Sequence, residues 1–167
     1  MDIKVIKDNG EYNSQIYSTI INAFKQDSEA NLVKNIKKYS DYYISYIALD
    51  DDKVVGHVMI SPMLLNETAN VLALAPVSVL ESYSNHGIGS RLIRMAIKEA
   101  MISEDYDLLS VLGSDHYYSR FGFEQYDTRK FELPFEIEKR YFQLLEIKKG
   151  VLKKLEGKFT YPEYFIV

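Results

Sequence analysis

A buried strand, a glycine-rich turn and an amphipathic helix follow one another between residues 71 and 102. The segment Val71–Leu80 is apolar at nearly every position, as expected of a central strand with both faces covered. Gly87 and Gly89 come next, and glycine allows unusual backbone angles and the close approach of a ligand. Residues 87–102 then place apolar side chains at i, i+1, i+4 and i+5 spacing, which indicates a helix with a broad buried stripe. Together these segments predict a sheet covered by a helix.

The turn Ser84–Ser90 leaves the first backbone amides of this helix accessible to a ligand. Such N–H groups have no partner inside a helix, and the helix end carries about half a positive charge. The turn can therefore hold a diphosphate without a lysine. A P-loop is not present, because no Gly-Lys-Ser/Thr follows, and Leu92 stands where a dinucleotide fingerprint needs its third glycine. By itself, the turn leaves a purely structural role equally open.

The rest of the 167-residue chain alternates between strand and helix patterns and has the length of one compact domain. Pro76 cannot donate a ladder hydrogen bond, which predicts a bulge or a splay in its strand. The element order is that of an α+β or mixed α/β fold. Apolar spacing predicts helices at Tyr12–Phe24, at Ser28–Lys38 with Ser28 as N-cap, and at Ser114–Arg120. Further strands are predicted at Ile3–Val5, Tyr42–Leu49, Lys53–Ser61, Asp107–Leu112, Phe123–Tyr126 and Tyr141–Ile147.

The composition argues against several classes of function. The formal net charge of −4 is opposite to the basic excess of a dedicated nucleic-acid binder. No cysteine occurs, so disulfides, thiolate metal sites and cysteine nucleophiles are excluded. The histidines, His57, His86 and His116, lack metal-ligand spacing, and no Gly-x-Ser-x-Gly elbow of a serine hydrolase is present. The longest apolar stretch is far shorter than the roughly 20 residues that cross a bilayer.

A second motif, Tyr117–Phe123, follows the strand Asp107–Leu112. In a strand–helix–strand unit, ligands bind beyond the carboxyl ends of the strands. A tyrosine here can therefore meet the far end of a ligand whose phosphates rest on the glycine turn, although tyrosines are more often packed in the core with the hydroxyl hydrogen-bonded.

With both motifs in place, the sequence resembles the GNAT superfamily of N-acetyltransferases. Val77–Ile93 looks like the family's acetyl-CoA strand and pyrophosphate loop, and Tyr118–Phe123 looks like its later tyrosine motif. One departure is Ser84, which stands where the family usually has glutamine or arginine. The resemblance covers residues 3–126, and the tail resembles the bacterial YhbS-type branch through Tyr141–Ile147, Gly150, Gly157 and Tyr161–Pro162.

This resemblance implies a single domain over residues 1–167, with a GNAT-like core at 1–126. An extension at 127–167 is expected to add a strand and to pack on the acceptor side. The implied fold is a splayed, mixed, mostly antiparallel sheet with helices on both faces. The implied reaction moves an acetyl group from acetyl-CoA to a primary amine of a small molecule by direct attack on the thioester, without a metal. A cytoplasmic enzyme is expected, with neither nucleic acid nor membrane as partner, and a homodimer is compatible with the family.

The resemblance also assigns roles to individual residues. The backbone of Val77, Ser78 and Val79 would pair with the pantetheine arm, and an N–H near Val79 would polarise the thioester carbonyl. Tyr118 would protonate the leaving thiolate, or else pack beside the sulfur. The pyrophosphate would rest on the loop formed by Ser84, Asn85, His86, Gly87, Ile88, Gly89 and Ser90.

The general base stays open at this point. His57 lies in mid-strand and carries an imidazole, whose intrinsic pKa suits proton transfer, while Glu81 and a water chain are alternatives. A histidine on a strand is more often structural than catalytic. Two other functions are also compatible with the sequence: an acyl-CoA-binding or regulatory domain without catalysis, suggested by Ser84 and the unassigned base, and an interaction module without a cofactor.

Overall fold

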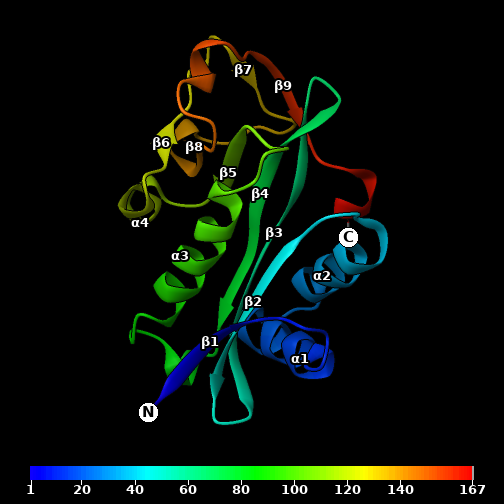
Figure 1. The fold of residues 1–167 in the computed structure, drawn as a ribbon, viewed down its shortest axis with the longest axis vertical. Helices are drawn as coiled ribbons and strands as arrows, with labels where there is room; N and C mark the ends of the chain where they lie inside the picture. Colours follow the sequence, from blue (N-terminus) through cyan, green and yellow to red (C-terminus); the bar gives the residue numbers. More distant parts are fainter. Residues whose placement is uncertain (167) are drawn as a thin grey trace.

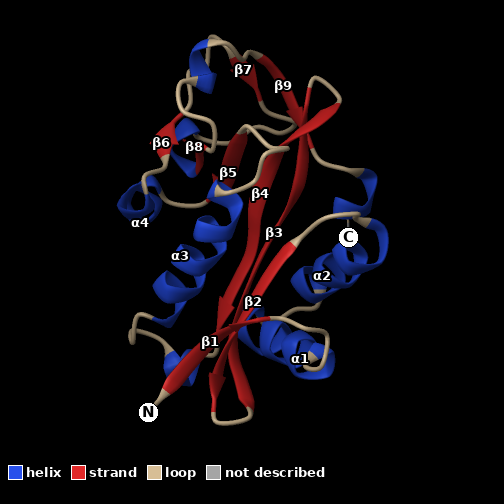
Figure 2. Cartoon of the chain, in the orientation of Figure 1, coloured by secondary structure: helices blue, strands red, loops and turns tan. Residues whose placement is uncertain are grey.

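The computed structural model describes residues 1–166 and shows one sheet with helices on both faces (Figures 1 and 2). Val167, the last residue of the predicted domain, lies outside the described residues. The strand order is β1-β2-β3-β4-β5-β8-β6, while β9 pairs with β3 and with β7. Among the described strands, only the pairs β4–β5 and β7–β9 are parallel. The expected mixed, mostly antiparallel sheet is confirmed. The strands are β1 (Ile3–Lys7), β2 (Ile44–Asp50), β3 (Lys53–Leu65), β4 (Thr68–Val79), β5 (Leu108–Leu112), β6 (Glu124–Gln125), β7 (Phe131–Glu132), β8 (Phe142–Glu146) and β9 (Gly157–Thr160).

The helices cover the two faces of the sheet with separate hydrophobic clusters. Leu92, Ile93 and Ala96 of α3 pack on one face, and Ile16 and Ile36 of α1 and α2 pack on the other (Figure 1). Over residues 1–166, no helix combines the length and the apolarity needed to cross a membrane. The α-helices are α1 (Asn13–Phe24), α2 (Ser28–Tyr39), α3 (Ile88–Met101) and α4 (Asp115–Tyr118). Single 3₁₀ turns occur at Glu81–Tyr83, Ser119–Phe121, Lys139–Tyr141, Val151–Lys153 and Glu163–Phe165.

Most predicted elements are found within a few residues of their expected bounds, and two details differ. Ser28 is the first residue of α2 and not its N-cap; Asp27 holds that position, and no side chain caps the helix. The strand predicted to end at Ser61 continues to Leu65, because the following turn needs only Asn66 and Glu67, both with positive φ. The segments β7 and β9 were not predicted, since they are too short for a clear alternation of polar and apolar residues.

Strand β4 separates from β5 halfway along its length. Residues 71–74 pair with residues 108–111, and the parallel ladder ends there. On its other edge, β4 stays paired with β3 as far as Val79, with a register shift near Pro76. The splay expected from Pro76 is therefore present. Leu80 N–H donates to Val55 O on β3 at 2.9 Å. Because successive N–H groups of a strand alternate in direction, those of Val77 and Val79 point to the open edge.

Candidate active site

The N-terminus of α3 is open where the chain leaves β4. Gly87 is the N-cap, with a φ of 76°, and Asn85 precedes it with a φ of 62°, so the turn depends on two left-handed residues. The backbone bond from Arg91 N to Gly87 O, at 3.1 Å, begins the helical ladder, and no side chain caps the helix. The first-turn amides of residues 88–90 therefore have no acceptor inside the helix.

A pocket of about 340 Å³ lies over these amides, and we call it the loop pocket. Of the lining residues within the described part of the chain, Arg120 alone carries a positive charge. The Arg120 Nε donates to Tyr117 O at 2.8 Å, and the guanidinium lies 4.3 Å from the centre of the Tyr117 ring. A helix N-terminus and a guanidinium at one hollow favour an anion. The lining residues are Val79, Tyr83, Ser84, Asn85, Gly87, Ile88, Gly89, Ser90, Tyr117 and Arg120.

Three residues predicted to contact the cofactor have side chains that face other groups of the protein, although Ser84 still lines the loop pocket. His86 does not line the loop pocket: its Nδ1 donates to Ser84 O at 2.8 Å, so the ring braces the turn. The Ser84 hydroxyl donates to Glu81 O at 2.7 Å, so only the rest of Ser84 is available to a ligand. The Ser78 side chain is buried, lines neither the loop pocket nor the pocket described next, and has no hydrogen-bond partner for its Oγ. Because the N–H groups of the strand alternate, that of Ser78 points towards β3 and not to the open edge, so a contact of Ser78 with a cofactor stays a prediction.

A second pocket, of about 460 Å³, occupies the splay between β4 and β5, and we call it the splay pocket. Neighbouring tyrosines line the two pockets, since Tyr118 lines the splay pocket and Tyr117 lines the loop pocket. The open edge of β4 joins the two pockets, with Val77 in one and Val79 in the other. The splay pocket is lined by Phe24, Glu29, Leu32, Leu74, Ala75, Pro76, Val77, Leu112, Tyr118, Tyr161 and Phe165.

The Tyr118 ring is fixed by its aromatic neighbours and by a glycine. Its centroid lies 5.0 Å from that of Tyr117 and 5.9 Å from that of Phe123, both in edge contacts. A Cβ atom on Gly113 would overlap the Tyr118 ring, coming within 2.9 Å of Cδ2, so glycine permits this position of the ring. Burial, with a smaller contribution from Tyr117, raises the pKa of Tyr118 to about 12. The hydroxyl is therefore protonated at neutral pH and available as a proton donor.

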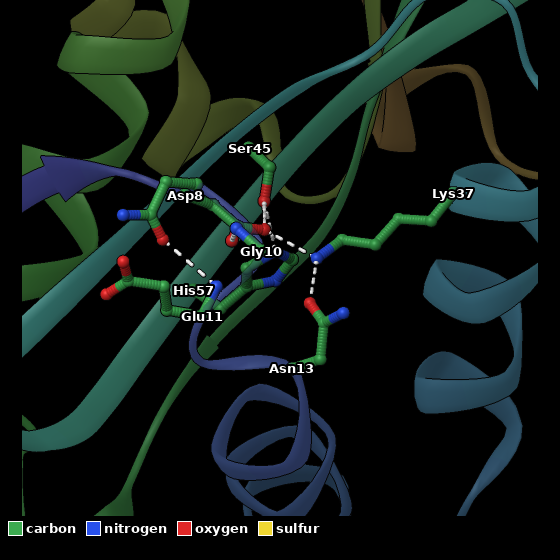
Figure 3. Close-up of polar contacts among 8 residues, drawn as sticks. Asp8, Gly10, Glu11, Asn13, Lys37, Ser45 and His57 are labelled. Carbon is green, nitrogen blue, oxygen red and sulfur yellow. Dashed lines mark hydrogen bonds and ion pairs between the residues drawn. The ribbon is translucent and has the colours of Figure 1, made fainter.

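His57, the predicted candidate base, lies on β3 with no exposed surface and lines neither pocket. Figure 3 shows the polar residues around it. Its Nε2 is 2.9 Å from Ser45 Oγ, and that hydroxyl donates to Asp8 Oδ2 at 2.8 Å. Because the Ser45 proton goes to Asp8, Nε2 of His57 is the donor and Nδ1 carries no proton. Burial lowers the pKa of His57 to about 3. A neutral, enclosed imidazole here cannot contact an amine in the splay pocket, so we assign His57 a structural role.

Asp8 is the charged centre of this buried network. Its carboxylate accepts hydrogen bonds from Lys37 Nζ at 2.6 Å and from Gly10 N at 2.9 Å, and Lys37 also donates to Asn13 Oδ1 at 2.7 Å (Figure 3). Burial by itself raises the pKa of Asp8, but the hydrogen bonds from Lys37, Gly10 and Ser45 outweigh it and lower that pKa. The network ties the end of β1 to α1, α2 and the sheet.

We expect His57 to make the fold sensitive to acid. Its pKa is about 3 in the folded protein and near 6.5 in an unfolded chain, so the unfolded state binds the extra proton between these values. The free energy of unfolding therefore falls as the pH drops from 6.5 towards 3, by about 2 kcal/mol between pH 7 and pH 5. Urea unfolding at both pH values measures this loss.

Between pH 7 and pH 5, the free energy of unfolding of His57→Gln should fall by about 2 kcal/mol less than that of the wild type. The matched control is His116→Gln, because His116 is exposed. Equal losses in the wild type and His57→Gln would show that His57 is not held neutral.

The structure also contributes site residues that the sequence did not indicate. Arg120 belongs to the loop pocket, and Glu29 and Phe165 belong to the splay pocket. A usable signal existed for Arg120, since three-residue spacing from Tyr117 places a cation on an aromatic ring. Glu81 lines neither pocket and is exposed beside Lys25, 3.9 Å away. Among residues 1–166, no group of three or more histidine, aspartate or glutamate side chains could hold a metal ion.

Comparison with known proteins places these features in a family. The sequence model of the acetyltransferase (GNAT) family matches residues 12–123. The uncharacterized N-acetyltransferase YhbS of Escherichia coli K12 is 27% identical over 145 residues, covering 86% of each chain. The uncharacterized N-acetyltransferase YjhQ of the same strain is 30% identical over 116 residues, covering 66% of this chain and 64% of the relative.

Solved structures show the same fold with related ligands. E. coli YhbS in complex with CoA superposes with a TM-score of 0.88 at 23% identity, covering 98% of this chain and 91% of that chain. A GNAT family acetyltransferase from Brucella melitensis in complex with acetyl-CoA superposes with a TM-score of 0.80 at 25% identity, covering 98% of both chains. From the family match and the splayed sheet that carries both pockets, we conclude that this chain is an acyltransferase that belongs to the acetyltransferase (GNAT) family.

Proposed function

We propose that this protein transfers the acetyl group of acetyl-CoA to a primary amine of a small molecule. The observation that carries the proposal is the pair of pockets along the unpaired edge of β4, a path that leads from the open N-terminus of α3 to Tyr118. The relatives that bind CoA and acetyl-CoA support the choice of donor. The cytoplasmic location and the homodimer stay predictions.

Acetyl-CoA fits this path from one pocket to the other. The amides of residues 88–90 and Arg120 hold the pyrophosphate in the loop pocket. The N–H groups of Val77 and Val79 bind the pantetheine arm as a neighbouring strand would. The thioester then lies in the splay pocket beside Tyr118, where an N–H of the same edge polarises its carbonyl.

The chemistry is a direct transfer. The neutral amine forms a bond to the acetyl carbon, the carbon–sulfur bond breaks, and Tyr118 gives its proton to the departing sulfur. The nitrogen releases one proton as the amide forms, and solvent returns a proton to Tyr118. An amine that enters as ammonium first gives a further proton to water.

The tail favours a small acceptor, because its residues Tyr161 and Phe165 line the splay pocket and close part of it. We assign residues 127–167 to this acceptor side and residues 1–126 to the core.

Two measurements on the intact protein test this function. Acetyl-CoA at a hundredfold excess over Kd should raise Tm by roughly 5–10 °C. A panel of primary amines should then produce free thiol from acetyl-CoA at rates that depend on the amine. A thermal shift without thiol release on any amine would instead identify a CoA-binding domain that lacks catalysis, and no shift at all would contradict both readings.

The variant Arg120→Gln localises the binding of CoA. It should weaken CoA about 10-fold, because it removes a charge-assisted contact to phosphate. Arg129→Gln serves as the control, since Arg129 pairs with Asp127 and lines neither pocket. If both variants bind CoA as the wild type does, the phosphates do not lie in the loop pocket.

A further inference from the structure

From the side chains of the splay pocket, we infer that the acceptor is a primary alkylamine that is cationic in solution and carries an apolar body, and that Glu29 binds its ammonium group. This inference rests on the proposed function and names the substrate class of the same site. It concerns recognition, so it can be tested by binding as well as by turnover.

The walls of the splay pocket are mainly apolar and aromatic. Tyr161 and Phe165 from the tail stack with centroids 4.6 Å apart and an interplanar angle of 13°, and Phe135 continues the stack on Tyr161 at 6.2 Å. Burial raises the pKa of Tyr161 to about 12, so its hydroxyl carries no charge at neutral pH. Phe24 and Leu112 are large apolar side chains with 36% and 42% of their surface exposed. Exposed apolar groups around a concave pocket indicate a ligand with an apolar body.

Among residues 1–166, Glu29 is the one lining residue of the splay pocket whose side chain carries a charge at neutral pH. It is half-buried in the first turn of α2, and Gln26 Nε2 donates to its two carboxylate oxygens at 2.9 and 3.0 Å. No lysine, arginine or histidine among residues 1–166 forms an ion pair with it. A half-buried carboxylate in an apolar pocket gains from a cationic partner. That partner is available from outside: the ammonium group of the acceptor.

The placement of Glu29 assigns it to the acceptor and not to the donor. The negative phosphates of acetyl-CoA belong to the loop pocket with Arg120, and the thioester that reaches Tyr118 is uncharged. Glu29, Phe24 and Leu32 come from the α1–α2 side of the splay pocket, whereas Tyr118 and Leu112 come from the β5 side. A cation beside aromatic faces is further stabilised by the ring electrons. Glu29 thus binds the ammonium form of the acceptor in the pocket, and the aromatic walls contact its apolar body.

Binding to the CoA-saturated protein tests this assignment with 2-phenylethylamine and its uncharged counterpart, 2-phenylethanol. Calorimetry should show that the wild type binds the amine at least about 10-fold more tightly than the alcohol. Glu29→Gln should reduce this ratio to within about 2-fold, and Glu29→Asp should restore part of it. Glu104→Gln is the matched control, since it removes one charge at an exposed position outside the pocket. Thermal unfolding of each variant verifies that it is folded.

Turnover gives a second, independent reading. In Glu29→Gln, kcat/KM for 2-phenylethylamine should fall about 10-fold, mainly through KM, whereas kcat/KM for aniline, which is uncharged at pH 7, should change by less than about 2-fold. Two results would overturn the inference. One is that the wild type binds 2-phenylethylamine and 2-phenylethanol equally tightly. The other is that Glu29→Gln lowers kcat/KM by the same factor for 2-phenylethylamine and for aniline. A Glu29-dependent preference for the amine without thiol release would uphold it while rejecting the acetyl transfer proposed above.

Discussion

Tyr118→Phe will lower kcat for acetyl transfer by about 10²-fold or more, while the Kd for acetyl-CoA changes by less than about 3-fold. The substitution removes only the hydroxyl and keeps the ring against Tyr117, Phe123 and Gly113. The thiolate must then leave without a proton from the enzyme. Steady-state kinetics measure kcat, and calorimetry measures the binding of acetyl-CoA.

The same variant decides between the two roles of Tyr118 that the sequence left open. If the ring merely packs beside the sulfur, Tyr118→Phe will retain most of its activity and only Tyr118→Ala will lose it. The pH profile adds a second criterion. The pKa of Tyr118 is raised to about 12, so loss of its proton should not lower kcat of the wild type up to pH 10. A phenol with an ordinary pKa near 10 would already be half ionised there.

Lys37→Met will lower the free energy of unfolding by about 3–5 kcal/mol at pH 7. The side chain of Asp8 has 2% of its surface exposed and that of Lys37 has 12%, and the two are joined at 2.6 Å. Without Lys37, the carboxylate keeps hydrogen bonds from Gly10 and Ser45 but has no opposite charge beside it. Urea unfolding measures the loss, which is a large part of the 5–15 kcal/mol typical of a domain.

The double variant Asp8→Asn/Lys37→Met provides the control. It removes both charges, so it should recover a large part of the stability lost in Lys37→Met, because the penalty comes from the unpaired carboxylate. Lys38→Met, one residue further along α2, removes a lysine that forms no ion pair among residues 1–166 and should change the stability by less than about 0.5 kcal/mol. A loss below 1 kcal/mol in Lys37→Met would mean that water screens the pair.

The parts of the fold that could be predicted from the sequence are those that depend on local patterns of residues. The apolar stripe of α3, the run of β4 and the glycine turn each depend on residues close together in the chain, and each is found in the structure. Pro76 indicated the splay because a missing donor has a direct effect on strand pairing. The loop pocket follows from the same local information, since its amides belong to a helix end that the sequence already located.

The splay pocket could not be predicted in the same way, because distant segments build it. Glu29 comes from the start of α2, Tyr161 and Phe165 come from the tail, and only the fold brings them to β4. For His57, the sequence suggested a site residue that the fold takes out of the site. An imidazole suggests proton transfer, but His57 is buried and is held in a hydrogen-bonded network with Ser45 and Asp8, which come from other parts of the chain. Side-chain burial depends on tertiary packing, and the spacing of residues along one strand does not reveal it.

The early end of the ladder between β4 and β5 has a mechanical consequence. Four residue pairs hold the N-terminal strands to β5 and the strands beyond it, and the short pairing of β9 with β3 adds a second joint. Pantetheine lying along the free edge of β4 would form hydrogen bonds in the place where β5 no longer pairs with it. The donor would then act as a temporary strand that holds the two parts of the sheet together during each turnover. Release of CoA would weaken the connection between these parts again.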